Sequence, residues 1–465
     1  MAKTGKRAEP LSAVDNAWLR MEDPTNLMMV TGILIFDQPL SFERLRDTIE
    51  QRLIGRFERF RQRVAAGGGP AQWEDDPNFT LAAHLHRIAL PAPGDQAALQ
   101  DLVSDLMSTP LDFSKPPWQY HLIEGYGDGC VVLARLHHCI ADGIALIHVL
   151  LSLTDDAPDA GLAGDGDGVP AARRRSPGPV AAVNATVRTA ERLLAGGIDA
   201  LLEPSRIRDT ARLGLGSLGA LNRLLLLSAD PPTAFKGRLG VAKRAVWSEP
   251  VPLDEVKAIG RAVGATVNDV LLAAVTGALR RYLQERGAPV DGLDIRAAVP
   301  VNLRSPDAPP SLGNQFGLVF LALPIGADDP LDRLHDLKER MEAIKGSPEA
   351  IVTFGILTAM GSGPSQVQDL GVGIFGAKAT AVMTNVPGPR QTIYLAGAPI
   401  RGIQFWVPQS GRLGLGVSIL SYAGQVTLGI ATDAGLVPDP EAIIRDFHAE
   451  FEQLKRLIPQ ASYEF

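Results

Sequence analysis

Two adjacent histidines end an apolar run in the stretch VVLARLHHCIADGIAL, residues 131–146. In an extended strand neighbouring side chains point to opposite faces, so His137 and His138 cannot easily serve one substrate or chelate one metal together. We therefore expect one histidine to do chemistry and the other to support it, and His138 lies nearer the turn that follows. A histidine held at a strand end suits a general base, because its ordinary pKa of about 6.5 is close to working pH.

Asp142 and Gly143 lie between this strand and the predicted helix GIALIHVLLSL. Gly143 suits a tight turn and a close backbone approach. Asp142 can cap the helix or pair with a cation from elsewhere in the chain. On the residues alone, the stretch remains a catalytic site, a metal site or an ordinary end of a buried strand.

Other catalytic signatures are weak or missing. A metal site would need a third ligand, and His84, His86 and His121 are candidates, but no H-E-x-x-H or comparable spacing occurs, so no metal is expected. No G-x-S-x-G elbow is found, which argues against a serine hydrolase of that type. GVGIFG at 371–376 matches G-x-G-x-x-G, but a strand-like run follows it and no acid lies about 20 residues on, so we do not interpret it as a dinucleotide site.

The bulk composition narrows the class of protein. The chain has 465 residues, 46% of them hydrophobic, which predicts two domains with large cores. Its net charge of −7 gives no attraction for nucleic acid, and none is expected as a partner. Two cysteines exclude a disulfide framework, and the first residues show no secretory signal, so we expect a cytoplasmic protein. No apolar run reaches about 18 residues, so any membrane contact is expected to be peripheral.

Each half of the chain mixes predicted strands with predicted helices, without regular βαβ alternation. This pattern favours an α+β fold of two layered domains over a doubly wound sheet. We place the first domain at 1–170, a linker and a basic Leu-rich helical segment at 171–240, and the second domain at 241–465. The middle segment carries eleven basic and five acidic residues, a net +6 inside an acidic chain.

Residues 188–228 hold two leucine stripes flanked by arginines. One interpretation is a helical linker packed between the domains. The other is an interfacial helix that meets anionic lipid with its arginines and buries its leucines among acyl chains, at a membrane or lipid-droplet surface.

The heptad HHCIADG resembles the H-H-x-x-x-D-G signature of acyltransferases with the two-domain chloramphenicol-acetyltransferase-like (condensation-domain-like) fold. Further segments resemble, in the same order along the chain, the bacterial wax ester synthase/diacylglycerol acyltransferase family, over about residues 10 to 450. These segments are PLSAVDNAWL (10–19), PLDFSKPPWQYHLIEG (110–125), VNDVLLAAVTGALRRYL (267–283), PVNLR (300–304), GNQFG (313–317), TNVPGP (384–389) and YLAGAPI (394–400). One departure is KPPW at 115–118, where the family more often has Arg-Pro-Leu-Trp.

The resemblance implies two domains, each a mixed sheet flanked by helices, with the active site in a channel between them. It also implies a reaction in which acyl-CoA donates a fatty acyl group to a long-chain alcohol or a diacylglycerol, giving a wax ester or a triacylglycerol. By the family's pattern His138 is the general base for direct attack by the acceptor hydroxyl, and His137 supports it. Acyl-CoA is then a co-substrate, and no cofactor is required.

The resemblance assigns the remaining site residues. Asp142 becomes structural, paired with an arginine for which Arg304 is the candidate, and Gly143 belongs to the same structural group. Asn268 and Asp269 match the family's Asn-Asp motif near the channel, where Asn268 is either an oxyanion donor or a helix cap. Two alternatives keep the fold: an acyltransferase that takes a carrier-protein-bound polyketide or peptide, and a non-catalytic lipid-droplet-associated binding protein.

Overall fold

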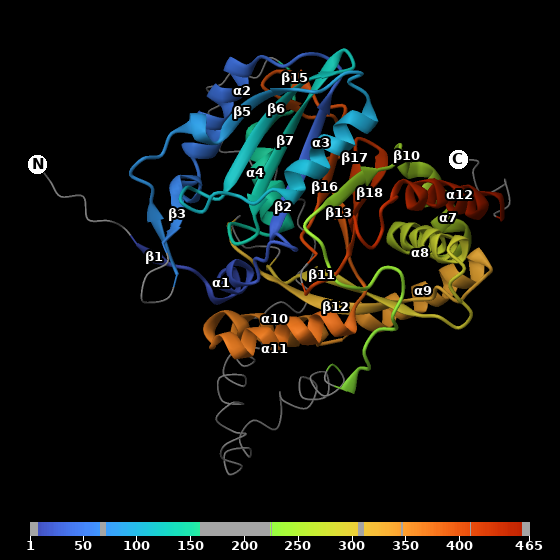
Figure 1. Cartoon of the computed structure of the whole chain (residues 1–465). Helices are drawn as coiled ribbons and strands as arrows, with labels where there is room; N and C mark the ends of the chain where they lie inside the picture. The colour runs from blue at the N-terminus through green and yellow to red at the C-terminus, as the bar shows by residue number, and fades with distance from the viewer. Residues whose placement is uncertain are drawn as a thin grey trace, which may run out of the picture.

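Two mixed β-sheets form the frame of the protein (Figure 1). The computed structural model describes residues 8–65, 71–158, 224, 226–305, 311–345, 347–409 and 411–457. In the first sheet the strand order is β16 (Gly402–Trp406), β2 (Met29–Phe36), β7 (Gly129–His137), β6 (Trp118–Tyr126) and β5 (Leu85–Ala89). In the second it is β10 (Val251–Pro252), β18 (Gln425–Asp433), β17 (Leu415–Tyr422), β13 (Ala381–Pro387), β11 (Ile295–Asn302) and β12 (Phe316–Leu323), with β9 (Lys243–Trp247) also paired to β18.

Helices cover both sheets, and two small sheets complete the fold. The helices of the first half are α1 (Ala13–Arg20), α2 (Phe42–Thr48), α3 (Gln96–Ser108) and α4 (Gly143–Leu153). Those of the second half are α7 (Leu253–Val263), α8 (Val267–Glu285), α9 (Pro330–Lys345), α10 (Glu349–Ser362), α11 (Ser365–Lys378) and α12 (Glu441–Leu457). The small sheets are β1 (Glu9–Pro10) with β4 (Gln72–Asp75) and β3 (Gln62–Ala65), and β15 (Ala398–Pro399) with β14 (Tyr394–Leu395) and β8 (Thr154–Asp155). The predicted α+β architecture of two mixed sheets flanked by helices is confirmed.

Local sequence explains where the helices start. The Ser41 hydroxyl accepts the Arg44 N–H at 3.3 Å and caps the start of α2. Leu45, Ile49 and Leu53 on its inner face are fully buried, with a turn of π-helix after α2. Apolar residues at this spacing share one face of a helix, and that is the face the chain buries here.

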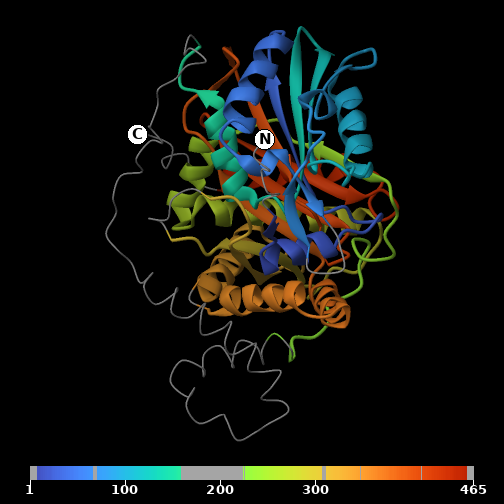
Figure 2. The same ribbon diagram turned by 90° about the vertical axis from the view of Figure 1, so that its left-hand side faces the viewer.

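Helices α10 and α11 were not predicted. Figure 2 shows them side by side at the base of the molecule. Glycines allow α10 to pack closely on two sides, because a Cβ at Gly361 would lie 1.6 Å from the Ala13 oxygen of α1, and one at Gly317 would lie 1.7 Å from the Ala350 oxygen. A helix with neighbours on several sides lacks the single apolar stripe that identifies a surface helix. The GVGIFG motif lies inside α11, away from any strand-to-helix turn, which agrees with its rejection as a dinucleotide site.

The two sheets do not follow the predicted domain boundaries. Strand β16 lies in the predicted second domain, yet it pairs antiparallel with β2, from Gly402 opposite Ile35 to Trp406 opposite Thr31. The β14–β15 hairpin likewise pairs with β8. At the other boundary, Asp230 lies in the predicted linker but accepts hydrogen bonds from the backbone and side chain of Arg296 in the second sheet. Residues 394–406 thus complete the first half, because sheet edges pair in space regardless of chain order.

Among the described helices, none alone has the length and apolar composition for a membrane span. The pair α7 and α8 meets those criteria only when taken together, and it is bent by 97°.

Candidate active site

His138 comes directly after β7, where a loop of the second domain meets the first. Its backbone N–H donates to the Met28 carbonyl at 2.7 Å, and its carbonyl accepts the Asn314 side-chain amide at 2.8 Å. Asn314 precedes β12 and is itself held by Asp15, whose carboxylate accepts both the backbone and the side-chain N–H of Asn314. The backbone of His138 is therefore fixed from both halves of the protein.

The imidazole of His138 is buried between aromatic rings. The Trp18 indole stacks on it with the ring centroids 4.1 Å apart and the planes at 20°, and the Phe316 ring lies 5.7 Å away. The Nδ1 atom is fully buried. Burial lowers the pKa of His138 to about 4, with the negative charge of Asp142 opposing that shift and His137 adding to it. The ring is therefore neutral at pH 7 and able to accept a proton.

His137 meets a different set of neighbours. Its Nδ1 accepts the Cys139 backbone N–H at 3.1 Å, which places the ring proton on Nε2. That Nε2 lies 3.4 Å from the Glu22 carboxylate, and the Phe113 ring stands edge-on to the imidazole at 5.1 Å. His137 thus stiffens the turn that carries His138, an arrangement suited to the supporting position expected for it.

Asp142 joins the start of α4 to the second domain. Its Oδ1 accepts the Ala145 N–H at 3.0 Å, which caps α4. Its Oδ2 accepts the Gln315 N–H at 2.9 Å and lies 2.5 Å from Nη1 of Arg304. The expected Asp142–Arg304 ion pair is therefore present. Arg304 also donates to the Gly313 carbonyl at 2.7 Å, so this buried cluster ties the heptad to the GNQFG loop.

Gly143 is not at a tight turn. It is the first residue of α4, and it is not among the residues with positive φ. A Cβ built there would meet no heavy atom within 4 Å. The expectation of a turn that requires glycine is therefore wrong, since the Asp142 cap sets the chain direction, and the space beside Gly143 is open.

The Asn-Asp motif lies in the first turn of α8, and its two residues have different surroundings. Thr266, not Asn268, is the helix cap, and the Asp269 carboxylate closes a capping box with it. Asp269 is buried, and its carboxylate shapes the start of the helix. Asn268 Oδ1 accepts the Asn385 side-chain amide at 2.9 Å, which leaves the amide N–H groups of Asn268 available. Asn385 lies in strand β13.

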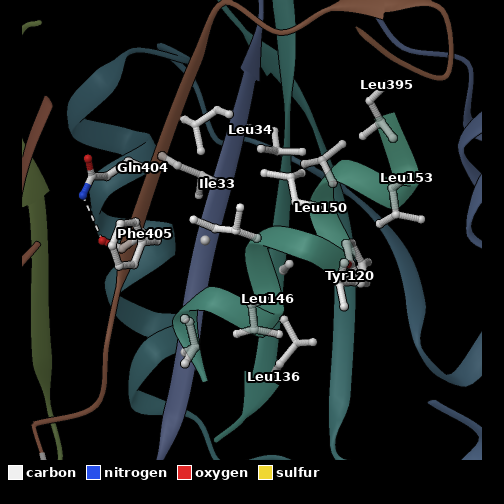
Figure 3. A pocket seen from close by; sticks show the side chains of 18 of the residues that line it. Ile33, Leu34, Tyr120, Leu136, Leu146, Leu150, Leu153, Leu395, Gln404 and Phe405 are labelled. Carbon is white, nitrogen blue, oxygen red and sulfur yellow. Dashed lines mark hydrogen bonds between the residues drawn. The ribbon is translucent and has the colours of Figure 1, made fainter. Parts of the chain in front are cut away.

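An apolar cavity of about 120 Å³ lies between the first sheet and α4 (Figure 3). Strand β7 contributes Val132, Ala134 and Leu136, which alternate along the same strand face and point toward the space that also borders Gly143. In Figure 3, Leu146, Leu150 and Leu153 of α4 project into the cavity opposite Leu34 of β2 and Tyr120 of β6. Sequence reasoning missed this cavity, because its apolar lining residues have the same pattern as a filled core.

No group of three or more histidine, cysteine or acidic side chains in the described part of the chain could hold a metal ion. The ring centroids of His86 and His121 lie 5.1 Å apart. The His84 ring instead stacks on Trp118 at 4.4 Å, and its Nδ1–H donates to the Trp118 carbonyl. Cys130 and Cys139 are both buried thiols.

The two mixed sheets, with the histidine heptad at their junction, define the class of the protein. Its fold is that of the two-domain acyltransferases and condensation domains. The structure is similar to the wax ester synthase/diacylglycerol acyltransferase from Marinobacter aquaeolei VT8, with a TM-score of 0.68 at 23% identity over 97% of this chain and 99% of that one. It is also similar to the starter condensation domain of rhizomide synthetase, with a TM-score of 0.59 at 12% identity over 97% and 94% of the two chains.

Sequence comparison gives the family. Residues 11–271 match the wax ester synthase/diacylglycerol acyltransferase catalytic domain, and residues 312–455 match the WS/DGAT C-terminal domain. A probable diacylglycerol O-acyltransferase of Mycobacterium tuberculosis is 30% identical over 94% of this chain and 93% of its own length. A second one from that organism is 29% identical over 96% and 98%. The chain belongs to the wax ester synthase/diacylglycerol acyltransferase family, and it is an acyltransferase.

Proposed function

We propose that this acyltransferase moves a fatty acyl group from acyl-CoA to the hydroxyl of a long-chain alcohol or a diacylglycerol, with His138 as the general base. One observation carries the proposal: a buried, neutral histidine follows directly on the strand whose residues line an apolar cavity. The cavity suits the hydrocarbon chain of a substrate, because burying apolar surface is favourable by about 25 cal/mol per Å². The histidine suits the proton transfer that the acceptor hydroxyl requires.

The proposed reaction needs no covalent enzyme intermediate and no cofactor. The hydroxyl proton of the acceptor passes to Nε2 of His138, since Nδ1 is buried, while the hydroxyl oxygen forms a bond to the thioester carbon. The tetrahedral intermediate then collapses with cleavage of its C–S bond. The CoA sulfur takes the proton from the imidazolium, which releases CoA and an ester and restores the neutral base.

The developing oxyanion requires a hydrogen-bond donor. We propose the Asn268 amide, because its oxygen accepts the Asn385 amide and its own N–H groups are left to donate.

Thiol release on acyl transfer tests the proposal. Purified protein is mixed with palmitoyl-CoA and either hexadecanol or dioleoylglycerol, and free CoA thiol is followed with time. Wild type is expected to release CoA only when an acceptor is present, and His138→Ala is expected to lose at least 100-fold, the lower range for removal of a general base. A folded His138→Ala protein with wild-type turnover would refute the role of His138.

One alternative keeps the fold and changes the donor to an acyl group bound to a carrier protein. The same assay distinguishes the two. If both lipid acceptors fail with palmitoyl-CoA and a carrier-bound acyl group reacts, the alternative holds. If no donor reacts, a non-catalytic lipid-binding role remains.

We also propose that residues 188–228 bring the enzyme to a membrane or lipid-droplet surface. Residues 188–223 and 225 lie outside the described part of the chain. At the end of the segment Leu224 is buried, whereas Leu226 is 75% exposed. Deleting 188–223 keeps Leu224 in place and is expected to abolish co-sedimentation with anionic vesicles, while thiol release from soluble substrates persists. Unchanged sedimentation of the folded deletion protein would contradict this role.

A further inference from the structure

Helix α1 contacts the site histidine in two ways, and neither contact was expected from the sequence. The indole of Trp18 stacks on the His138 imidazole and is only 3% exposed. One helical turn earlier, Asp15 holds Asn314, which donates to the His138 carbonyl. Residues three apart lie on the same side of a helix, so α1 presents both groups to the histidine at once.

The stacked geometry restricts how the imidazole can turn. With planes at 20° and centroids at 4.1 Å, rotation of the His138 ring about χ2 would drive its edge into the indole face. The Phe316 ring lies 5.7 Å from the imidazole and 5.8 Å from the Trp18 ring, at tilted angles, and closes a further side. The ring plane, and with it the direction of the Nε2 lone pair, is therefore set by Trp18.

The indole face of Trp18 also affects the protonation of the His138 ring. A base that accepts a proton becomes an imidazolium, and burial disfavours that cation here. Asp142 forms an ion pair with Arg304, whereas among the described residues His138 forms none. The face of an indole carries negative quadrupole density, which stabilises a cation held against it. Trp18 therefore acts on the protonated form specifically.

We infer that Trp18 is a positioning residue for acyl transfer, which fixes the plane of His138 and stabilises the imidazolium formed as the acceptor hydroxyl gives up its proton. The inference rests on the proposed function, in which that proton moves to Nε2 and returns to the CoA sulfur as the C–S bond breaks. Trp18 itself exchanges no proton and forms no bond.

Substitution of Trp18 gives the first test. Trp18→Leu removes the π face and is expected to lower kcat about 5- to 30-fold, the range that cation–π energies correspond to, with KM for palmitoyl-CoA unchanged. Trp18→Phe keeps an aromatic face and is expected to stay within about threefold of wild type. Phe60→Leu, a buried aromatic substitution elsewhere in the first domain, is the matched control and is expected to lower stability without lowering kcat.

The pH profile separates this role from a purely structural one. The acid limb of kcat/KM reports His138 in the free enzyme, and a less stable imidazolium moves that limb to lower pH in Trp18→Leu, by about 0.7 to 1.5 units. A packing residue would change the melting temperature and leave the limb in place. An unchanged limb with unchanged kcat in folded Trp18→Leu overturns the inference.

Incorporation of 5-fluorotryptophan tests the role of Trp18 even if Trp18→Leu fails to fold. 5-Fluorotryptophan weakens the negative face of the ring with little change of shape, and the chain has five tryptophans that would all carry it. Fluorination is expected to lower kcat about two- to threefold in wild type and not in the Trp18→Phe background. Equal effects in both backgrounds overturn the inference. A fully active His138→Ala would instead overturn the proposed function.

Discussion

Helices α4 and α8 each begin at a side-chain cap and pack in the core of their own half of the protein. In α8, fourteen of nineteen residues are buried, and their side chains fill the space against α7, α12 and the second sheet. In α4, three of eleven residues are buried, although its sequence is almost wholly apolar. Leu146, Leu150 and Leu153 of α4 line the cavity in Figure 3, whereas Leu151 is exposed to solvent.

The two helices therefore differ in what surrounds them: α8 lies in a filled core, whereas α4 borders a cavity. Filling the space beneath α8 gives the second domain a solid core. The cavity beneath α4 costs packing energy, because the side chains that line it lack dispersion contacts on one side. The cavity is lined by residues of β7, the strand that His138 directly follows, and under the proposed function a hydrocarbon substrate there would restore those contacts.

The starts of the two helices provide the largest expected contrast. Arg304→Ala leaves the buried Asp142 carboxylate without its cation and is expected to lower the free energy of unfolding by about 3–5 kcal/mol. Asp269→Ala removes only a local capping box at α8, with an expected loss of about 1 kcal/mol. Denaturant unfolding of both variants measures the contrast. Equal losses would mean that the Asp142 cluster does not tie the domains together.

The middles of the helices provide the second contrast. Leu279→Ala in the solid core is expected to cost about 2–5 kcal/mol, because it opens a new cavity. Leu150→Ala borders space that is already open, so we expect a loss of about 1 kcal/mol together with a shift toward bulkier or longer acyl donors. The measurements are thermal unfolding and thiol release across acyl-CoA chain lengths. A loss at Leu150 as large as that at Leu279 would contradict an open cavity.

Two glycines give the smallest and most specific contrast. A Cβ at Gly277 of α8 would lie 2.1 Å from Glu450 Oε2 and 2.6 Å from Arg333 Nη2, so Gly277→Ala is expected to cost about 1–3 kcal/mol. A Cβ at Gly143 would meet nothing within 4 Å, so Gly143→Ala is expected to change stability by less than about 0.5 kcal/mol. If substrate occupies the open space beside Gly143, Gly143→Ala is expected to change KM in the thiol-release assay. An unaltered KM would argue that substrate does not approach Gly143.

The sequence predicted those parts of the site that are local in the chain. Strand periodicity separated His137 from His138, and the two rings do meet different neighbours. The resemblance supplied Arg304 as the partner of Asp142, and the pair is present. Family motifs also supported the α+β fold of two mixed sheets, because segments such as HHCIADG and GNQFG keep their order along the chain.

The parts that escaped prediction depend on contacts between distant segments. Trp18 lies 120 positions before His138, and nothing in its surroundings distinguishes a ring that stacks on a base from one in a core. Asn314 belongs to a loop motif in the sequence, and only the fold brings its side chain to the Asp15 carboxylate. Gly143 and Asp269 were assigned roles by motif, whereas the open space and the capping box that decide those roles exist only in three dimensions.

The pairing of β16 with β2 has a consequence for synthesis on the ribosome. Strand β2 ends at Phe36 and its edge partner begins at Gly402, more than 360 residues later. At 5–20 residues per second the free edge of β2 waits about 20 to 70 s for that partner. The first half is therefore expected to need a chaperone or a temporary cover during translation, and a fragment that ends before residue 402 is expected to aggregate through this edge.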